Sequence, residues 1–151
     1  LPRLEGSTLP PTKFRSGKGV RMGDELVVVG YPLKGILSSG AVVTTGIVNA
    51  LTGFSDDTSA FQMSATVQPG SSGGPIFDHN GLLVGVVRAR MLPSGPIAAL
   101  NVNFGINQAT LASFLDAYSV DYTVNTAASK TMSLVDITAM AQKSTVQVEC
   151  Y

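Results

Sequence analysis

The 151 residues contain ten basic and ten acidic side chains, so no net charge draws the chain toward nucleic acid or an anionic membrane. Charged residues make up 13% of the chain and hydrophobic residues 44%, which excludes intrinsic disorder and predicts one packed domain. The longest apolar runs, residues 26–29 and 82–87, are far shorter than the roughly 20 residues that span a bilayer, so no transmembrane helix is predicted.

The N-terminus and the cysteine content say little about cellular location. The chain lacks an initiator methionine and a basic-then-apolar signal region, so we expect the natural start to lie upstream of Leu1. Cys150 is the only cysteine, and its presence indicates neither an oxidising nor a reducing compartment. It could be a half-buried strand residue or could pair with a cysteine outside this sequence.

Short strands dominate the chain from Glu25 to Arg90. The runs rich in Val, Ile and Thr are residues 25–30, 41–51, 61–66, 75–78 and 82–90. Turn residues separate them, and Asn80-Gly81 is the strongest hairpin signal because both residues of that turn type need a positive φ. Regular short strands at this spacing predict an antiparallel barrel or sandwich.

A further strand and a helix are expected to complete this unit. The strand covers residues 101–106, and Asn107 follows as the N-cap, because an asparagine oxygen accepts from the free N–H groups of the first helical turn. The helix runs from about residue 108 to 119 with its apolar residues on one face, so it should pack against the barrel.

The remaining residues are expected to form a tail. Residues 121–130 are polar and are interpreted as a linker. Ser133-Leu134-Val135-Asp136 resembles a capping box that opens a helix to about Lys143, and residues 145–151 alternate like a final strand. We therefore divide the chain into residues 1–120, a β-barrel with its helix, and residues 121–151, a linker, helix and strand of unknown role.

A strand that runs into a glycine-dense bend with two serines, residues 62–75, carries the candidate chemistry. A hydroxyl that attacks a carbonyl needs backbone N–H groups aimed at the developing oxyanion, and glycines let the main chain turn sharply enough to provide them. Ser72 is the candidate nucleophile, and the N–H groups of Gly70 and Ser72 are the candidate oxyanion hole. Gly73 and Gly74 keep the wall beside Ser72 free of side chains.

Other interpretations of this bend fit less well. The nucleophile elbow of an α/β-hydrolase demands a helix straight after the serine, whereas Pro75 and a strand follow here. A phosphate-binding loop needs a following helix or a lysine, and the bend has neither. His79, the only histidine, lies in a turn after an intervening strand and should point away from Ser72; no metal-ligand spacing surrounds it. No metal or cofactor is predicted.

Four sequence blocks that occur in one order point to a particular protein family more specifically than the bend does alone. Residues 70–75, Gly-Ser-Ser-Gly-Gly-Pro, resemble the active-site signature of the trypsin-like serine proteases. Residues 21–32, 43–48 and 81–86 recur around it in bacterial Deg-type (HtrA-like) members. The resemblance covers about residues 1–119. It implies the second of the family's two barrels, a mainly β, six-stranded antiparallel Greek-key barrel with a C-terminal helix, here followed by the short helix-strand tail.

The resemblance implies a serine-type endopeptidase that hydrolyses peptide bonds through an acyl-enzyme on Ser72. The family's catalytic histidine and aspartate lie on the first barrel, which precedes this sequence, so the isolated chain should be nearly inactive. The segment before the bend should form a pocket for a small or aliphatic residue, and the strand after it should pair with an extended substrate. These substrate-binding residues are Ala65, Thr66, Val67, Arg88, Ala89 and Arg90.

The expected partners follow from this resemblance. They are a polypeptide substrate and the missing N-terminal barrel, with neither nucleic acid nor membrane among them. A barrel without its partner exposes an interdomain face through which a homodimer could form. A secreted or periplasmic location is expected for the same reason. An alternative of another class stays open, a non-catalytic pseudoprotease or scaffold module that holds extended peptides without cutting them.

Overall fold

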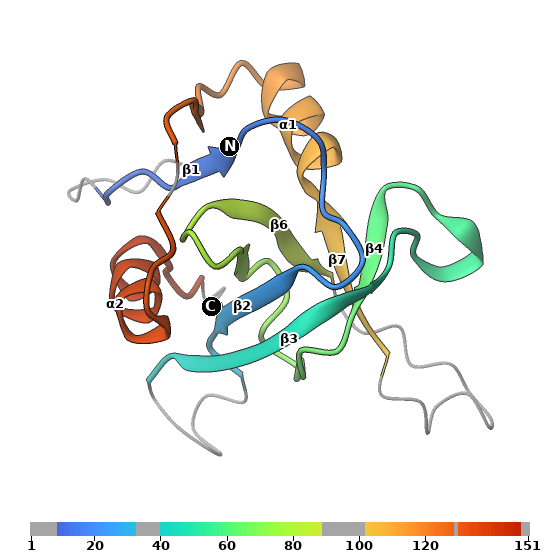
Figure 1. The fold of residues 1–151 in the computed structure, drawn as a ribbon, viewed down its shortest axis with the longest axis horizontal. Helices are drawn as coiled ribbons and strands as arrows, with labels where there is room; N and C mark the ends of the chain where they lie inside the picture. The colour runs from blue at the N-terminus through green and yellow to red at the C-terminus, as the bar shows by residue number, and fades with distance from the viewer. Residues whose placement is uncertain (1–8, 33–39, 89–101, 129, 149–151) are drawn as a thin grey trace.

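A computed structural model describes residues 9–32, 40–88, 102–128 and 130–148 of the chain (Figure 1). The described part consists of short strands with two α-helices and one 3₁₀ turn. Their bounds are β1 (Lys13–Arg15), β2 (Glu25–Gly30), β3 (Val42–Ala50), η1 (Phe54–Asp56), β4 (Ala60–Met63), β5 (Pro75–Phe77), β6 (Leu83–Arg88), β7 (Asn103–Asn107), α1 (Gln108–Ala117), β8 (Thr123–Asn125) and α2 (Leu134–Ser144).

Six antiparallel strands close into a barrel. They follow the order β5-β2-β3-β4-β7-β6, and β5 pairs with β6 to complete the ring. The predicted mainly β fold and six-stranded barrel are therefore confirmed. Because successive strand side chains point to opposite faces, Leu26 and Val28 of β2 enter the barrel, whereas Val27 and Val29 face outward. β2 is apolar without a break because both of its faces are buried.

Two hydrophobic clusters fill and cover the barrel, and each large side chain in them gains about 1.5–3 kcal/mol from burial. The inner cluster comprises Leu26, Val28, Val48, Phe61, Met63, Ala65, Val67, Ile76, Val84 and Val87. The outer cluster comprises Phe14, Val27, Val29, Phe77, Leu83, Ile137 and Ala141. Since the outer cluster contains residues of α2, the barrel's core extends through the sheet to the C-terminal helix.

The helix of the predicted tail is part of the packed structure. Ser133 caps α2 as predicted, because its hydroxyl oxygen accepts the Asp136 N–H at 3.1 Å, and the hydroxyl donates to the Asp136 carboxylate at 2.6 Å. Ile137 and Ala141 lie on one face, four residues apart, and both are buried. That face packs against β2, so α2 lies alongside the barrel (Figure 1).

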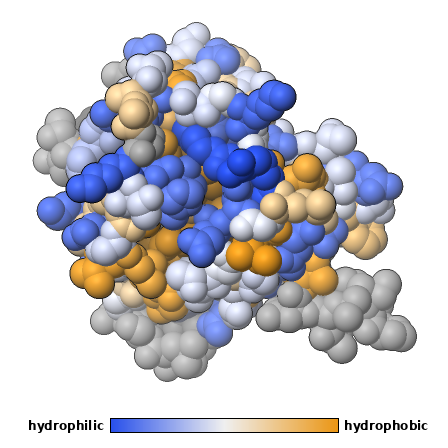
Figure 2. Space-filling model, in the orientation of Figure 1, coloured by the Kyte–Doolittle hydropathy of each residue, from blue (hydrophilic) through white to orange (hydrophobic). Residues whose placement is uncertain are grey.

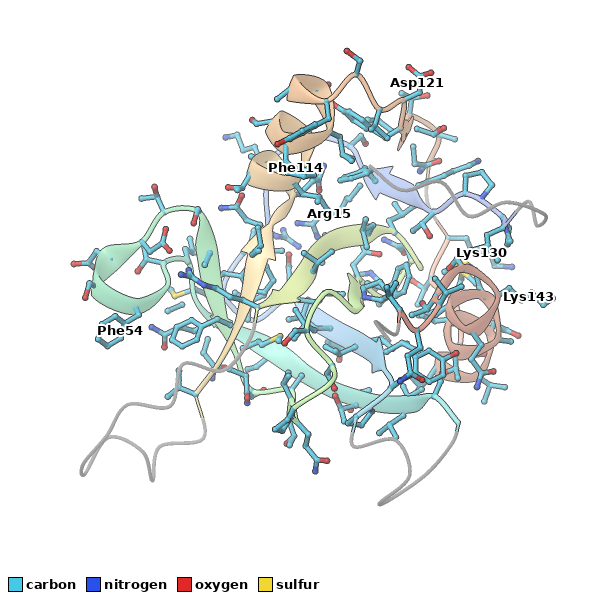
Figure 3. All side chains as sticks on the ribbon, turned by 180° about the vertical axis from the view of Figure 1, so that it is seen from behind. Arg15, Phe54, Phe114, Asp121, Lys130 and Lys143 are labelled. Atoms are coloured by element: carbon cyan, nitrogen blue, oxygen red, sulfur yellow. The ribbon has the colours of Figure 1, made fainter. Side chains whose placement is uncertain are left out.

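The other helix is bounded as predicted at its start. The Asn107 side chain accepts the Thr110 N–H at 2.9 Å, which confirms the N-cap, and α1 lies against β6 and β7. Its apolar residues are not all on the packed face. Leu111 and Leu115 pack against the outer cluster, whereas Phe114, labelled in Figure 3, is exposed. Tyr118 is also exposed, and its ring centroid lies 4.7 Å from that of Phe114.

Two stretches of the predicted tail differ from expectation. Residues 121–130, interpreted as a linker, contain β8, which pairs in parallel with β1. This pairing depends on main-chain bonds and on a ring contact between Phe14 and Tyr122 at 5.0 Å, so the polar sequence of β8 does not reveal it. Residues 145–148 belong to no strand, although a final strand was expected there; residues 149–151 lie outside the described residues.

The predicted Asn80-Gly81 turn also differs in detail. Only Gly81 takes a positive φ, of 72°, whereas the prediction required it of both residues. The reason is Asp78, whose buried carboxylate accepts the Asn80 and Leu82 N–H groups at 2.9 and 3.0 Å and sets a longer turn. The turn still joins β5 to β6 as expected.

The strand expected over residues 61–66 ends at Met63. At the next residue, Ser64, a side-chain bond takes over part of the pairing with β3. The Ser64 N–H donates to the Ile47 carbonyl at 3.0 Å, and the Ser64 hydroxyl oxygen accepts the Ile47 N–H at 2.9 Å. The chain then crosses Gly46, where a Cβ would lie only 2.2 Å from the Ala65 nitrogen. This close crossing directs the following residues out of the sheet and toward the glycine-dense bend.

The molecule's surface carries an apolar groove of about 500 Å³ between α2 and β3, where hydrophobic side chains gather in Figure 2. Val43 lines its β3 side, and Leu134, Val135 and Ala139 line its α2 side. Leu134 and Val135 are exposed. The same helix therefore buries one face against the barrel and leaves apolar side chains on another.

A cluster of charged residues ties β1 to the barrel. The Arg15 guanidinium, labelled in Figure 3, lies 3.0 Å from the Asp24 carboxylate and 3.7 Å from that of Asp78. Asp24 also accepts the backbone N–H of Arg21 at 3.0 Å. Burial raises the pKa of Asp24, but the hydrogen bonds from Arg21 and Arg15 outweigh it, so the pKa lies below its usual value.

We expect Asp24→Asn to lower the free energy of unfolding by about 1–3 kcal/mol at pH 7, because it removes charge-assisted hydrogen bonds from a largely buried group. Since the folded-state pKa is depressed, this stabilisation is present above the unfolded pKa of about 4 and is lost as the pH falls through the folded pKa. Urea denaturation at pH 7 and at lower pH measures it. The exposed Asp121→Asn is the control, and equal midpoints for Asp24→Asn and the parent at pH 7 would contradict the prediction.

Candidate functional site

The bend that carries Ser72 has a defined backbone geometry. The Ser71 N–H donates to the Gln68 carbonyl and the Gly74 N–H donates to the Ser71 carbonyl, both at 3.0 Å. Gly70 and Gly73 have positive φ angles of 95° and 81°, which a residue with a side chain adopts only under strain. Two glycines are therefore needed for the bend to turn this tightly on either side of the serine pair.

Two further hydrogen bonds attach the bend to β6. The Gly73 N–H donates to the Val87 carbonyl, and the Val87 N–H donates to the Gly74 carbonyl, each at 2.8 Å. The opposite side of the bend packs against β2, because a Cβ on Gly74 would lie 2.4 Å from the carbonyl oxygen of Val29. The bend is thus held between two strands of the barrel.

The two serines of the bend have different surroundings. Ser71 is only 7% exposed, and its side chain packs beside Gly30, where an added Cβ would lie 3.1 Å from it. Ser72 is exposed and lines a cleft of about 620 Å³. Among the described residues, neither the Gly70 nor the Ser72 N–H has a hydrogen-bond partner.

The cleft has a second wall that the sequence did not predict. Residues 145–148, which follow α2, line it opposite the bend, together with Gly30 and Tyr31. The Tyr31 hydroxyl lies 3.5 Å from the Thr145 carbonyl oxygen. Because these residues are 114 positions apart, no local pattern could have brought them together in a prediction.

The three residues predicted to form a specificity pocket differ in exposure. Ala65 and Val67 are buried in the inner cluster, and Thr66 between them is exposed. The carbonyl of Thr66 accepts the Thr44 hydroxyl at 2.9 Å, which fixes this segment to β3. Of the predicted pocket, only Thr66 therefore presents its side chain to solvent.

The predicted substrate strand is described only up to Arg88, which ends β6; Ala89 and Arg90 lie outside the described residues. The Arg88 guanidinium lies 2.5 Å from the carboxylate of Asp57, a residue that the sequence analysis missed. Hydrogen bonds from the Ser59 hydroxyl and from Arg88 lower the pKa of Asp57 to about 2. Asp57 is therefore ionised, and paired with Arg88, at neutral pH.

His79 is placed apart from the bend. It is exposed in the turn between β5 and β6 and lines a hollow with Leu134 and Ile137, whereas Ser72 lines the cleft. None of the described residues that line the cleft with Ser72 is a histidine, lysine, aspartate or glutamate. Nor does the described part of the chain gather three His, Cys, Asp or Glu side chains that could hold a metal ion.

No helix within the described ranges is both long and apolar enough to cross a membrane.

Comparison with protein families gives a match over residues 1–86 to the trypsin-like peptidase domain. The uncharacterized protein y4bJ of Sinorhizobium fredii is 36% identical over 135 residues, which are 86% of this chain and 21% of that protein. A probable periplasmic serine endoprotease, DegP-like, of Bartonella henselae is 40% identical over 102 residues, 64% of this chain and 19% of that protein. A probable periplasmic serine protease, do/HhoA-like, of Haemophilus influenzae is 37% identical over 109 residues, 69% of this chain and 22% of that protein. The chain spans about a fifth of the length of these relatives.

The packing of the bend gives a test of its geometry. We expect Gly74→Ala to lower the free energy of unfolding by about 1–3 kcal/mol, because the added Cβ meets the Val29 carbonyl and nothing nearby can yield cheaply. Gly19→Ala is the matched control; no atom lies within 4 Å of its added Cβ, and its effect should stay within about 0.5 kcal/mol. Urea denaturation followed by circular dichroism compares the two, and equal losses would contradict the crowding described for the bend.

Proposed function

We propose a function for this chain, which belongs to the trypsin-like peptidase family and is similar to Deg-type members. It contributes the second barrel of a serine endopeptidase, the half that carries the nucleophile and the oxyanion hole. The observation that carries this proposal is the bend itself. It exposes one serine hydroxyl beside two N–H groups that have no partner in the described structure.

Ser72 attacks the carbonyl carbon of the scissile peptide bond, and its proton passes to a histidine that another barrel supplies. The N–H groups of Gly70 and Ser72 donate to the oxyanion of the tetrahedral intermediate. Loss of one such donor typically costs 10²–10³-fold in rate, because the charge develops where water cannot replace the donor. The amine leaves with the histidine's proton, and water then hydrolyses the acyl-enzyme on Ser72.

The isolated chain is nearly inactive in this proposal. A serine hydroxyl without a base is a weak nucleophile, and no described residue that lines the cleft with Ser72 can act as that base. The partner that supplies the histidine and the aspartate is the family's N-terminal barrel. Without that partner, the interdomain face is available for a second copy of this chain.

The substrate is a polypeptide that binds in extended form along the end of β6. Arg88, Ala89 and Arg90 offer backbone groups for pairing, as in other strand-addition modes. Of Ala65, Thr66 and Val67, Thr66 borders the pocket for the residue before the scissile bond, while Ala65 and Val67 lie in the inner cluster beside it. None of the three carries a charge, so we expect a small or aliphatic residue there and no preference for Lys or Arg.

The location proposed for the whole protein is the periplasm or the exterior of the cell. The names of the Bartonella and Haemophilus relatives describe periplasmic proteases, and both match more than three fifths of this chain.

A peptide-binding pseudoprotease is the second candidate. The observation behind it is the cleft of about 620 Å³ that Ser72 lines, which can hold a peptide without cutting it. The two candidates predict different reactivity of Ser72 once the N-terminal barrel is present.

A fluorophosphonate probe tests the nucleophile. In the longer protein that includes the N-terminal barrel, we expect rapid covalent labelling at Ser72, and in this chain alone labelling slower by on the order of 10³-fold or more, because no base activates the hydroxyl. Ser72→Ala should abolish labelling. Ser71→Ala is the matched control and should retain it. Unchanged labelling of Ser72→Ala would refute the proposal, and a longer protein that binds peptides but resists the probe would favour the pseudoprotease.

A further inference from the structure

We propose that the ion pair between Asp57 and Arg88 positions the nucleophile bend by fixing the end of β6. The inference rests on the proposed role of Ser72. It assigns Asp57 and Arg88 a positioning role, in which neither side chain touches the substrate. Three features of the structure carry it: the edge of β6 on which the bend depends, the contacts of the Asp57 carboxylate and the strained turn that delivers it.

The edge of β6 changes its partner at Val87. β5 pairs with this edge as far as Val86, which lies opposite Pro75. At Val87 the partner is the bend, through the two hydrogen bonds of 2.8 Å to Gly73 and Gly74. Any shift of Val87 along or away from the barrel therefore moves the two glycines that follow Ser72. Arg88 is the next residue and the last of the strand, so its side chain is placed to control that shift.

The Asp57 carboxylate is occupied on both oxygens. One oxygen accepts the N–H and the hydroxyl of Ser59, at 2.9 and 2.6 Å, and the other accepts from Arg88 at 2.5 Å. The carboxylate is thus oriented by its own turn before it meets the guanidinium. A preoriented carboxylate loses little conformational entropy on pairing, and it can fix Arg88 more firmly than a freely rotating surface acid would.

The turn that delivers Asp57 is strained. Ser55 and Asp56, two successive residues other than glycine, have φ angles of 55° and 58°, in the left-handed region that strains residues with a side chain. The backbone is held in this form by the Gly53 N–H, which donates to the Asp57 carbonyl at 2.7 Å. Figure 3 shows the turn by its exposed Phe54, which points away from the barrel. The strained backbone directs Asp57 back toward β6 while Phe54 faces solvent.

These contacts also define what Arg88 does. Its side chain is 37% exposed, but its charge is already engaged by Asp57. The side chain is therefore held on the side of the η1 turn, and the Arg88 backbone lies opposite Phe104 of β7. Asp57 and Arg88 together connect the β3–β4 turn to the bend through one residue, Val87.

Amide hydrogen exchange on this chain tests the proposal without any need for catalysis. We expect Asp57→Asn to raise the exchange rates of the Gly73 and Val87 amides by about three- to tenfold, because the end of β6 opens more often once the charge pair is lost. The amide of Val28, in the centre of β2, should not change. Asp56→Asn is the matched control; it lies on the same turn, tolerates the same φ and forms no ion pair among the described residues.

The partner side chain supplies the second half of the test. Arg88→Gln should reproduce the exchange pattern of Asp57→Asn, and Arg88→Lys, which keeps the charge, should restore most of the protection. In the longer protein, Asp57→Asn should lower kcat, since the bend that carries Ser72 is disturbed, whereas Asp56→Asn should not.

Unchanged exchange at Gly73 and Val87, or an equal rise at Val28, would overturn the positioning role. So would an Arg88→Lys variant that behaves like Arg88→Gln. Failure of the proposed nucleophile looks different, because the fluorophosphonate would then not label Ser72 while the exchange pattern stayed as expected. The two hypotheses can therefore fail separately.

Discussion

The candidate site depends on how one short bend is bonded to one strand. The Gly73 N–H and the Gly74 carbonyl both pair with Val87, where β6 has run out of pairing from β5. A bend bonded only to itself could rotate about its ends and would not aim the Gly70 and Ser72 N–H groups in a fixed direction. Because Val87 also pairs with β7 and has its side chain in the inner core, the direction of those N–H groups is set by the barrel.

The same dependence explains why burial is so uneven around the bend. Ser71 packs beside Gly30, and Gly74 packs against the Val29 carbonyl. The inner side of the bend therefore has no room to move. Ser72 lies on the other side, exposed in the cleft. A nucleophile needs access, and donors to an oxyanion need rigidity. The bend meets both requirements by burying one serine and exposing its neighbour.

Much of this arrangement was predictable from the sequence. The apolar run of β2, the Asn107 and Ser133 caps, and the glycine-framed serine are local patterns, and each has a local physical cause. The contacts that sequence reasoning missed join distant residues: Arg88 to Asp57, Tyr31 to Thr145, and β8 to β1. These contacts are made by polar side chains or by three-residue strands, and neither leaves a periodic pattern in the sequence. For the same reason the burial of Ala65 and Val67, which follows from a close backbone crossing at Gly46, could not be foreseen.

In the function proposed above, two barrels divide the catalytic work, and the packing of this chain fits that proposal. The bend that carries Ser72 is bonded to β6 and packed against β2, so its half of the proposed site can be ordered before any base arrives. Donors and binding alone leave on the order of 10³-fold catalysis over water when a triad is lost. Under this proposal the proton acceptor supplies the larger remaining factor, and it need only approach the exposed side of Ser72. An interface that brings the base to that side would then control the reaction without rebuilding the bend.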